Sequence, residues 1–214
     1  MKKDHNKANK NNNQVIQLAP NEISAYIGRD EAYRESGNYD HTVVDYTQAM
    51  WVDSDNAGTY RFHGLKYYEK KDYDRAIECC NQAIRLAPTE FKNYICRGDA
   101  YQMKDDYDHA IADYTQAIKL KPNKPKIYKK RSSVYLYKND YDQAIADYTQ
   151  AIRLDPNNAS AYGHRGLAYS YKGDYVRAIE DCTQAIRLDP NNTMHKEVLE
   201  LIQQSRESKI QLGE

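Results

Sequence analysis

The chain has 214 residues, enough to bury a sizeable core, and its 31 basic and 31 acidic side chains cancel to a formal charge of zero. This balance argues against a globally basic nucleic-acid binder and against an acidic solubilising tail. Tyrosine is the unusual residue type, with 21 Tyr against 2 Phe and 1 Trp. The mean hydropathy of -0.97 suggests disorder, but hydropathy scales score tyrosine as polar although its ring packs as a large group.

The sequence contains no evident membrane span or leader. It has no run of about 18 apolar residues. Its start, Met-Lys-Lys-Asp-His-Asn, turns polar where a signal peptide carries an apolar stretch. The four cysteines form no recognisable disulfide framework. We therefore expect a cytoplasmic protein, an expectation that a targeting segment upstream of Met1 would change.

A 34-residue period organises most of the chain. The string Asp-Tyr-Thr-Gln-Ala-Ile occurs at 113–118 and again at 147–152, and related strings continue this spacing in both directions. Five copies follow one another without insertion or deletion, and we number them repeats 1 to 5: 23–56, 57–90, 91–124, 125–158 and 159–192. Such regular spacing is a specific sign of a repeat architecture, in which neighbouring units stack to bury a continuous core.

Two segments precede the first repeat. Residues 1–14 are rich in Asn and Lys, so we expect a disordered polar tail there. Residues 15–22 contain Val-Ile-Gln-Leu-Ala-Pro, which matches Ala-Ile-Arg-Leu-Ala-Pro at 83–88. This match predicts that 15–22 is the remnant of a preceding repeat, at the end of its second helix.

Each repeat is predicted to form two helices joined by a short turn. In repeat 5 the first helix covers about 159–172, where Tyr162 and Tyr169 share one face. Gly173 breaks this pattern, and Asp174 is a suitable N-cap for the second helix. The second helix carries an apolar stripe with helical spacing, formed by Ala178, Ile179, Cys182, Ala185, Ile186 and Leu188. It ends at the Asp-Pro pair that follows, because proline cannot continue a helix.

This helix-turn-helix period resembles the tetratricopeptide repeat. The residues of repeat 5 that match the family pattern are Tyr162, Gly166, Tyr169, Ala178, Ala185 and Pro190. The resemblance spans 23–192 and implies an all-α fold, a right-handed α-α superhelix (solenoid) whose first helices line a concave groove. Small residues such as Gly166 and Ala178 let the two helices of a repeat approach each other closely.

Two repeats depart from the family pattern. Repeat 1 has Asp30, Thr42 and Ser54 where the pattern places glycine, alanine and proline, and repeat 4 has Ser132 in place of the glycine. Terminal repeats are often atypical because one of their faces meets water. Repeat 1 therefore suits an end position in the array.

The segment 193–214 is predicted to be a C-terminal capping helix with a short tail. Apolar residues recur at helical spacing and are expected to cover repeat 5: Met194, Val198, Leu201 and Ile202. The opposite face is polar. The alternative, a partial sixth repeat, lacks the glycine and tyrosine signals of the other repeats.

Two charged positions change together along the array. Position 7 of the successive repeats is Arg29, His63, Arg97, Arg131 and Arg165, and position 23 is Asp45, Cys79, Asp113, Asp147 and Asp181. We predict an Arg–Asp pair that links the two helices in four repeats and is replaced by His63 and Cys79 in repeat 2. The alternative is that these are separate solvated charges.

No catalytic or metal-binding pattern stands out. His63 with Cys79 and Cys80 suggests a nucleophile or a metal ligand, but Cys80 and Cys182 occupy position 24, a packing position that holds tyrosine in the other repeats. The sequence has no zinc-ligand spacing, P-loop, dinucleotide fingerprint or nucleophile-elbow motif. We expect no enzyme activity, no cofactor and no metal.

The resemblance implies that positions 2, 5, 9, 12 and 13 of the first helices line the groove. Together with neighbouring lysines they give the predicted peptide-binding residues, which are Arg61, Leu65, Tyr68, Lys92, Asp99, Met103, Lys126, Lys129, Lys130, Tyr137 and Tyr171. The stretch 114–139 holds basic residues and no acidic one. We therefore expect a protein-interaction scaffold whose ligand is a partly acidic peptide or protein segment.

Two other functions remain open. The chain could self-associate through the stacking face of repeat 1 near Ile23. The lysines of 119–131 could bind nucleic-acid phosphates, although only Tyr137 is placed to stack on a base. A two-carboxylate clamp of the kind found in some family members is not predicted, because Leu65 and Cys96 stand where it needs asparagines.

The tyrosines separate into two groups. Eighteen fall at repeat positions 4, 11, 17 and 24, where we expect their rings to pack between helices. The other three, Tyr68, Tyr137 and Tyr171, lie outside this register on the first helices. These three are the tyrosines that we expect to contact a ligand.

Overall fold

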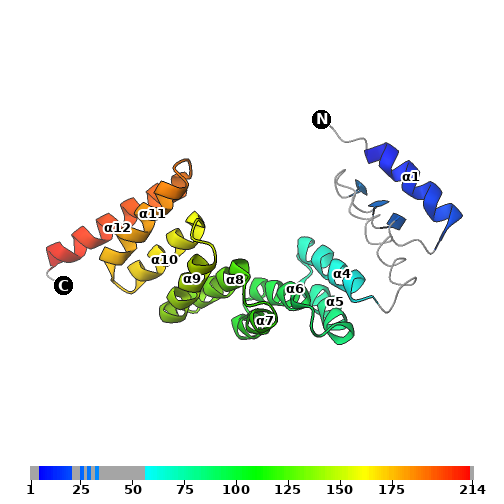
Figure 1. Cartoon of the computed structure of the whole chain (residues 1–214), viewed down its shortest axis with the longest axis horizontal. Coiled ribbons are helices and arrows are strands. Elements are labelled where there is room, and N and C mark those ends of the chain that lie inside the picture. Colours follow the sequence, from blue (N-terminus) through cyan, green and yellow to red (C-terminus); the bar gives the residue numbers. More distant parts are fainter. Residues whose placement is uncertain (1–4, 21–24, 27, 30–31, 34–55, 213–214) are drawn as a thin grey trace. The chain divides into compact units, whose positions relative to one another are not determined.

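The structure is a computed structural model of the chain, and it describes residues 5–20, 25–26, 28–29, 32–33 and 56–212 (Figure 1). The regular elements in these ranges are all α-helices. The chain divides into two compact units, the N-terminal unit Met1–Pro88 and the C-terminal unit Thr89–Glu214. Most of repeat 1 lies outside the described residues, and so do its expected second helix and Asp45 of its expected Arg–Asp pair.

In the N-terminal unit, helix α1 (His5–Leu18) replaces the disordered tail that we expected over 1–14. The partly buried residues of α1 recur at helical spacing: Ala8, Asn9, Asn12, Asn13 and Ile16. Arg29 Nη1 donates a hydrogen bond of 2.5 Å to Asn13 Oδ1, and the Asn12 side chain lies against Gly28. The prediction of disorder was wrong over 5–14 because these contacts stabilise a helix that an Asn-rich composition disfavours.

The register of α1 extends the expected repeat remnant towards the N-terminus. Counted in the 34-residue period, His5–Leu18 spans positions 17–30 of a preceding repeat, the same positions as helix α5 (Tyr73–Leu86) in repeat 2. Ala8 then falls at the position of Ala76 in α5, which is fully buried. Residues 15–18 thus form the end of helix α1, in the register of the second helix of a repeat.

Repeat 2 forms the helix pair α4 (Ala57–Glu69) and α5, which pack against each other. Asn56 caps α4 by accepting hydrogen bonds from the amides of Gly58 and Thr59. Asp72 caps α5 through the amide of Arg75. Lys71, between the two helices, has a positive φ of 63°.

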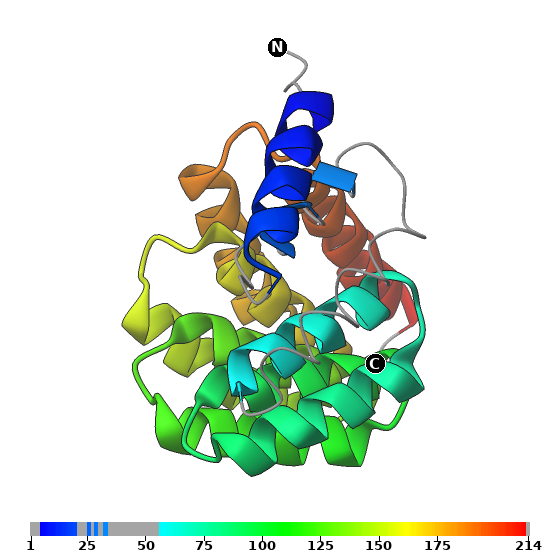
Figure 2. The ribbon, with the colours of Figure 1, turned by 90° about the vertical axis from the view of Figure 1, so that its right-hand side faces the viewer.

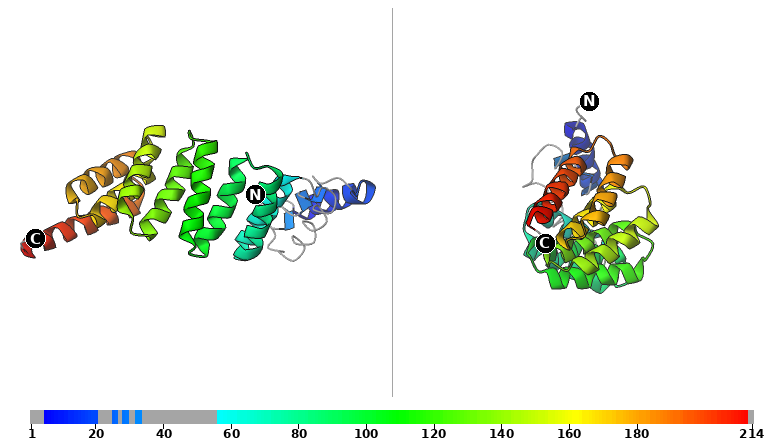
Figure 3. Two further views of the ribbon diagram at one scale, coloured as in Figure 1. Left: turned by 90° about the horizontal axis from the view of Figure 1, so that it is seen from below. Right: turned by 90° about the vertical axis from the view of Figure 1, so that its left-hand side faces the viewer.

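The C-terminal unit is a solenoid of three helix pairs and one further helix. Its elements are α6 (Phe91–Met103), α7 (Tyr107–Leu120), α8 (Pro125–Tyr137), α9 (Tyr141–Leu154), α10 (Ala159–Tyr171), α11 (Tyr175–Leu188) and α12 (Thr193–Leu212). Consecutive helices pack on each other, and the left panel of Figure 3 shows them in chain order from green to red. The pairs turn progressively relative to one another along the unit (Figure 2), as in a superhelix.

The turn inside each repeat follows from residues at positions 15 and 16. Position 15 adopts a left-handed backbone conformation in Asp105, Asn139 and Gly173, residue types that tolerate positive φ. Position 16 is an aspartate whose carboxylate accepts a hydrogen bond from the amide three residues later, as Asp140 does from Gln143. These two positions end the first helix and start the second at the same place in every described repeat.

Close packing within the pairs depends on small residues, as the sequence predicts. A Cβ atom on Gly166 would lie 2.9 Å from Cys182 Sγ and 3.0 Å from the Ala178 carbonyl oxygen. The alanines at positions 20 and 27 of the second helices are fully buried: Ala110, Ala117, Ala144, Ala151, Ala178 and Ala185. Ser132 replaces the glycine in repeat 4, and its buried hydroxyl donates to the Tyr128 carbonyl at 2.7 Å.

Helix α12 combines the two alternatives for the C-terminus. Its packed face is formed by His195, Val198, Leu199 and Ile202. Met194 and Leu201, which we predicted to cover repeat 5, are 54% and 62% exposed, so that part of the prediction was wrong. His195 and Ile202 stand at positions 3 and 10 of a sixth repeat, the positions that are also buried in α8 and α10. The cap therefore docks in the register of a sixth first helix.

Candidate functional site

The predicted Arg–Asp pairs form in repeats 3, 4 and 5. In each of them the guanidinium group donates two hydrogen bonds to one carboxylate, and the distances are 2.9 and 2.7 Å for Arg97–Asp113, 2.7 and 2.7 Å for Arg131–Asp147, and 2.7 and 2.8 Å for Arg165–Asp181. These hydrogen bonds raise the pKa of each arginine. We call them Arg–Asp bridges, and they join the first and second helix of a repeat.

Two of the bridges also reach the preceding repeat. Arg131 Nη1 donates to Thr115 Oγ1 at 2.8 Å, and Arg165 Nη1 donates to Thr149 Oγ1 at 3.0 Å. The threonines belong to the Thr-Gln-Ala strings that first revealed the repeat. A single arginine therefore orients three helices, which fixes the side chains of the first helices relative to one another.

Repeat 2 has a different chemistry at the same two positions. His63 is 3% exposed, and burial lowers its pKa to about 4. Burial raises the pKa of the Cys79 thiol to about 11. At neutral pH both groups are uncharged, and a protonated thiol is a poor nucleophile and metal ligand. Among the described residues, no group of three His, Cys, Asp or Glu side chains is placed to hold a metal ion.

The predicted peptide-binding residues of the C-terminal unit lie on one side of the first helices. We call this surface the first-helix face and define it by repeat positions 2, 5, 6, 9, 12 and 13 of α6, α8 and α10. Lys130 Nζ on α8 lies 2.8 and 3.0 Å from the two carboxylate oxygens of Asp99 on α6. This ion pair shows that the faces of α6 and α8 adjoin. It also means that Lys130 is already neutralised.

Further lysines of the basic stretch are engaged within the chain. Lys129 Nζ donates to Asn158 Oδ1 at 3.3 Å and to Ser160 Oγ at 3.1 Å, and burial lowers its pKa. Lys138 forms an ion pair with Asp108. The cationic surface is therefore smaller than the sequence suggests.

Lys92 and Lys126 are exposed and form no ion pair with any residue that the structure describes. Both stand at position 2, in the first turn of α6 and α8. A helix N-terminus carries a partial positive charge, so a lysine there is less favourable for helix stability than an acidic residue. At α6 the carboxylate of the N-cap residue Glu90 accepts a hydrogen bond from the Lys92 amide and offsets the partial charge of that helix end, whereas no side chain caps α8. This edge of the first-helix face therefore carries two exposed ammonium groups and one uncapped helix N-terminus.

Two of the three tyrosines that we expected at the ligand help to join repeats. The ring of Tyr137 stacks on that of Tyr107 with centroids 5.8 Å apart, and the ring of Tyr171 lies 5.4 Å from that of Tyr141. Both remain largely exposed, at 63% and 57%, as does Met103 at 48%. Each therefore leaves apolar surface open to solvent.

The remaining predicted residues, Arg61, Leu65 and Tyr68, lie on α4 in the N-terminal unit. Leu65 is 38% exposed, and the Tyr68 ring contacts the Tyr73 ring edge to face at 5.7 Å.

A pairing of positions 9 and 24 was missed at the sequence level. The buried ring of Tyr114 carries its hydroxyl to the first-helix face, where it donates to Asp99 at 2.7 Å, and the Tyr148 hydroxyl lies 3.3 Å from Ser133 Oγ. Repeats 2 and 5 have leucine at position 9 and cysteine at position 24 instead. This joint change was visible in the sequence and marks which repeats present polar groups on the face.

Family models match the greater part of the repeat region. The tetratricopeptide repeat model matches residues 64–90, 92–124 and 159–192, and a second TPR repeat model matches 132–173. A search of curated proteins gave no match. No helix in the part of the chain that the structure describes is long and apolar enough to cross a membrane.

Several solved structures share the fold. A crystal structure of MamA protein has a TM-score of 0.70 and 26% identity, over 80% of this chain and 94% of that one. The crystal structure of YrrB, described as a TPR protein with an unusual peptide-binding site, has a TM-score of 0.69 and 19% identity, over 87% of this chain and 96% of that one. PilF from Pseudomonas aeruginosa has a TM-score of 0.73 and 18% identity, over 90% and 88% of the two chains. At these last two identities the likeness concerns the fold alone.

Proposed function

Because the chain belongs to the tetratricopeptide repeat family, whose members are protein-interaction scaffolds, we propose that it binds a partly acidic peptide segment on its first-helix face. The proposed mechanism involves no covalent chemistry. It combines electrostatic attraction of carboxylates with burial of apolar side chains of the ligand.

The observation that carries the proposal is the pair Lys92 and Lys126. They are the exposed cations of this face without an ion-pair partner among the described residues, and both occupy helix N-termini, where they do not help their own helices. An acidic ligand would gain from both ammonium groups and from the N-terminus of α8, which no side chain caps. The exposed side chains of Met103 and Tyr137 supply apolar contacts on the same two helices.

The ion pairs of the face support specificity more than attraction. Asp99 is held by Lys130 and by the Tyr114 hydroxyl, so its position is fixed before a ligand arrives. A fixed polar group loses little entropy on binding. Repeats 3 and 4 therefore present a preorganised polar surface, and repeat 5 presents Leu167 at the equivalent of Asp99.

The test uses a peptide obtained by selection from a random dodecapeptide library on the immobilised full chain. We expect the selected peptides to be enriched in Asp and Glu, and Lys92→Glu with Lys126→Glu to weaken binding of a synthetic representative at least about tenfold. The matched control is Lys196→Glu, an exposed lysine on α12. Fluorescence anisotropy gives the affinities and circular dichroism confirms that the variants fold.

The proposal fails if the double variant binds the acidic peptide as tightly as the wild type. Nucleic-acid binding through the lysines of 119–131, the lesser alternative, is disfavoured because Lys129 and Lys130 are engaged within the chain. It predicts a steep salt dependence for a labelled oligonucleotide. Self-association through repeat 1 involves a surface that lies mostly outside the described residues and stays a prediction.

A further inference from the structure

Two interactions recur where one repeat meets the next in the C-terminal unit. A tyrosine at position 17 packs its ring against a tyrosine at position 13 of the following repeat, in Tyr107–Tyr137 and Tyr141–Tyr171. An aspartate at position 18 forms an ion pair with a lysine at position 14 of the following repeat, in Asp108–Lys138 and Asp142–Lys172. We call the ring contact and the ion pair together the repeat seam.

At the junction between α11 and α12 half of each interaction is present and half is missing. Tyr175 and Arg206 supply the ring of position 17 and the cation of position 14. Their counterparts are changed, because Ser205 stands in the place of the second tyrosine and Val176 in the place of the aspartate. Within the described residues, Tyr175 accordingly makes no ring–ring contact and Arg206 no ion pair.

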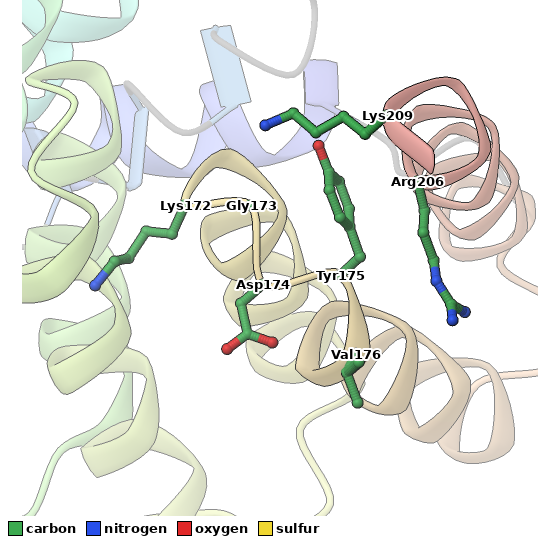
Figure 4. A pocket seen from close by; sticks show the side chains of 7 residues that line it. All are labelled: Lys172, Gly173, Asp174, Tyr175, Val176, Arg206 and Lys209. Carbon is green, nitrogen blue, oxygen red and sulfur yellow. The ribbon is translucent and has the colours of Figure 1, made fainter. Parts of the chain in front are cut away.

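A pocket of about 640 Å³ opens at this incomplete seam (Figure 4). Its lining residues are Lys172, Gly173, Asp174, Tyr175, Val176, Arg206 and Lys209. Figure 4 shows the Tyr175 ring extending from the start of α11 towards α12, which contributes Arg206 and Lys209. The pocket is thus lined both by the ring that lacks a second ring beside it and by the cation that lacks an ion pair.

The charge that remains available in the pocket is positive. Lys172 is bound to Asp142, and Asp174 is bound to Arg177. Arg206 and Lys209 are exposed and have no acidic partner among the described residues. Val176, 60% exposed, adds an apolar wall. The pocket therefore offers a ring surface, an apolar wall and two uncompensated cations.

We propose that this pocket binds a peptide segment of a partner protein in which an aromatic side chain stands next to a carboxylate. The ligand's ring would pack on Tyr175, in the place where the neighbouring seams have a second tyrosine ring. Its carboxylate would accept hydrogen bonds from the Arg206 guanidinium and would be attracted by the ammonium group of Lys209. A peptide is the favoured occupant because the chain itself fills the equivalent places with a tyrosine ring and an aspartate. The site uses no residue of the first-helix face, so it does not depend on the function proposed above.

The binding test titrates the full-length chain with the capped peptide acetyl-Gly-Ser-Tyr-Asp-Ser-Gly-amide and follows amide shifts by NMR. Shifts are expected at residues 173–176 and 202–209. Replacing the peptide's tyrosine by alanine or its aspartate by asparagine should weaken binding at least about fivefold, because each removes one of the two matched groups. Adenosine monophosphate, which combines a ring with an anion, is titrated in parallel.

Two sets of variants complete the test. Val176→Asp with Ser205→Tyr restores the seam from within the chain, and we expect it to raise the melting temperature and to reduce peptide binding at least about tenfold. Arg206→Glu with Lys209→Glu should lose binding without a lower melting temperature. The proposal is overturned if the peptide binds both double variants as it binds the wild type, if the alanine and asparagine peptides bind equally well, or if adenosine monophosphate binds more tightly than the peptide.

Discussion

Repeat 2 and repeats 3 to 5 solve the same packing problem in different ways. In repeats 3 to 5, a bidentate Arg–Asp bridge joins the two helices, and its carboxylate is nearly buried, with 5% to 9% of the side chain exposed. In repeat 2 the same positions hold His63 and Cys79, both uncharged at neutral pH because of burial. The two solutions keep helices of the same length and register.

The difference teaches what the charged bridge adds. Helix pairing itself follows from the small residues and the apolar stripe, which repeat 2 shares with the others. The bridge adds a fixed orientation, because one arginine can also reach a threonine of the preceding repeat, as Arg131 reaches Thr115. Buried ion pairs contribute little net stability but are costly to break. We therefore expect repeats 3 to 5 to respond strongly to loss of one partner and repeat 2 to respond to pH.

The largest effect is expected from Asp147→Ala in repeat 4. The change leaves the Arg131 guanidinium, 17% exposed, without its carboxylate, and should lower the free energy of unfolding by about 3 kcal/mol. The matched control on the same helix is Asp142→Ala, which breaks an exposed ion pair and should cost less than about 1 kcal/mol. Urea unfolding followed by circular dichroism measures the free energy of unfolding of both variants. Equal losses would show that the buried bridge is no more costly to break than an exposed ion pair.

A smaller effect is expected from pH in repeat 2. Burial lowers the pKa of His63 from 6.5 to about 4, so the folded chain binds fewer protons than the unfolded chain between these values. The free energy of unfolding therefore keeps its full value above about pH 6.5 and declines as the pH falls towards 4, because the unfolded chain takes up the proton first. From pH 7 to pH 5 the wild type should lose about 2 kcal/mol more than His63→Gln. If urea unfolding shows the same loss of free energy between pH 7 and pH 5 for the wild type and for His63→Gln, the lowered pKa of His63 is contradicted.

The smallest effect concerns the turn inside the repeats. Lys71 in repeat 2 adopts φ of 63°, where repeat 5 has Gly173 at φ of 80°. The left-handed conformation is strained for lysine and free for glycine, although glycine also gives the unfolded chain more freedom. Lys71→Gly should therefore stabilise the chain by about 0.5 kcal/mol, and Gly173→Lys should destabilise it by a similar amount. A melting temperature that moves in the opposite direction in either variant would argue against strain at this position.

Much of the fold and part of the candidate site could be predicted from the sequence. The 34-residue period located the helix pairs of repeats 2 to 5, and the joint change of positions 7 and 23 identified the Arg–Asp bridges before any contact was known. The ends of the array were less predictable. Composition suggested disorder where α1 forms, and the hydrophobic pattern placed Met194 and Leu201 on the packed face of α12, where they are exposed.

The sequence alone determined the helices and turns that recur in every repeat. Each of them is indicated by the same residues in several repeats, and the small residues, turns and caps that define them act within one repeat. Only the tertiary structure decided which charges are available to a ligand. Lys129, Lys130 and Lys138 look alike in the sequence as members of one basic stretch, but their partners lie on other helices, whereas Lys92, Lys126 and Arg206 find no carboxylate among the described residues. The same is true of α12, whose docking in the register of a sixth repeat leaves the incomplete seam beside Tyr175. Contacts between helices far apart in sequence set these outcomes, and no local pattern records them.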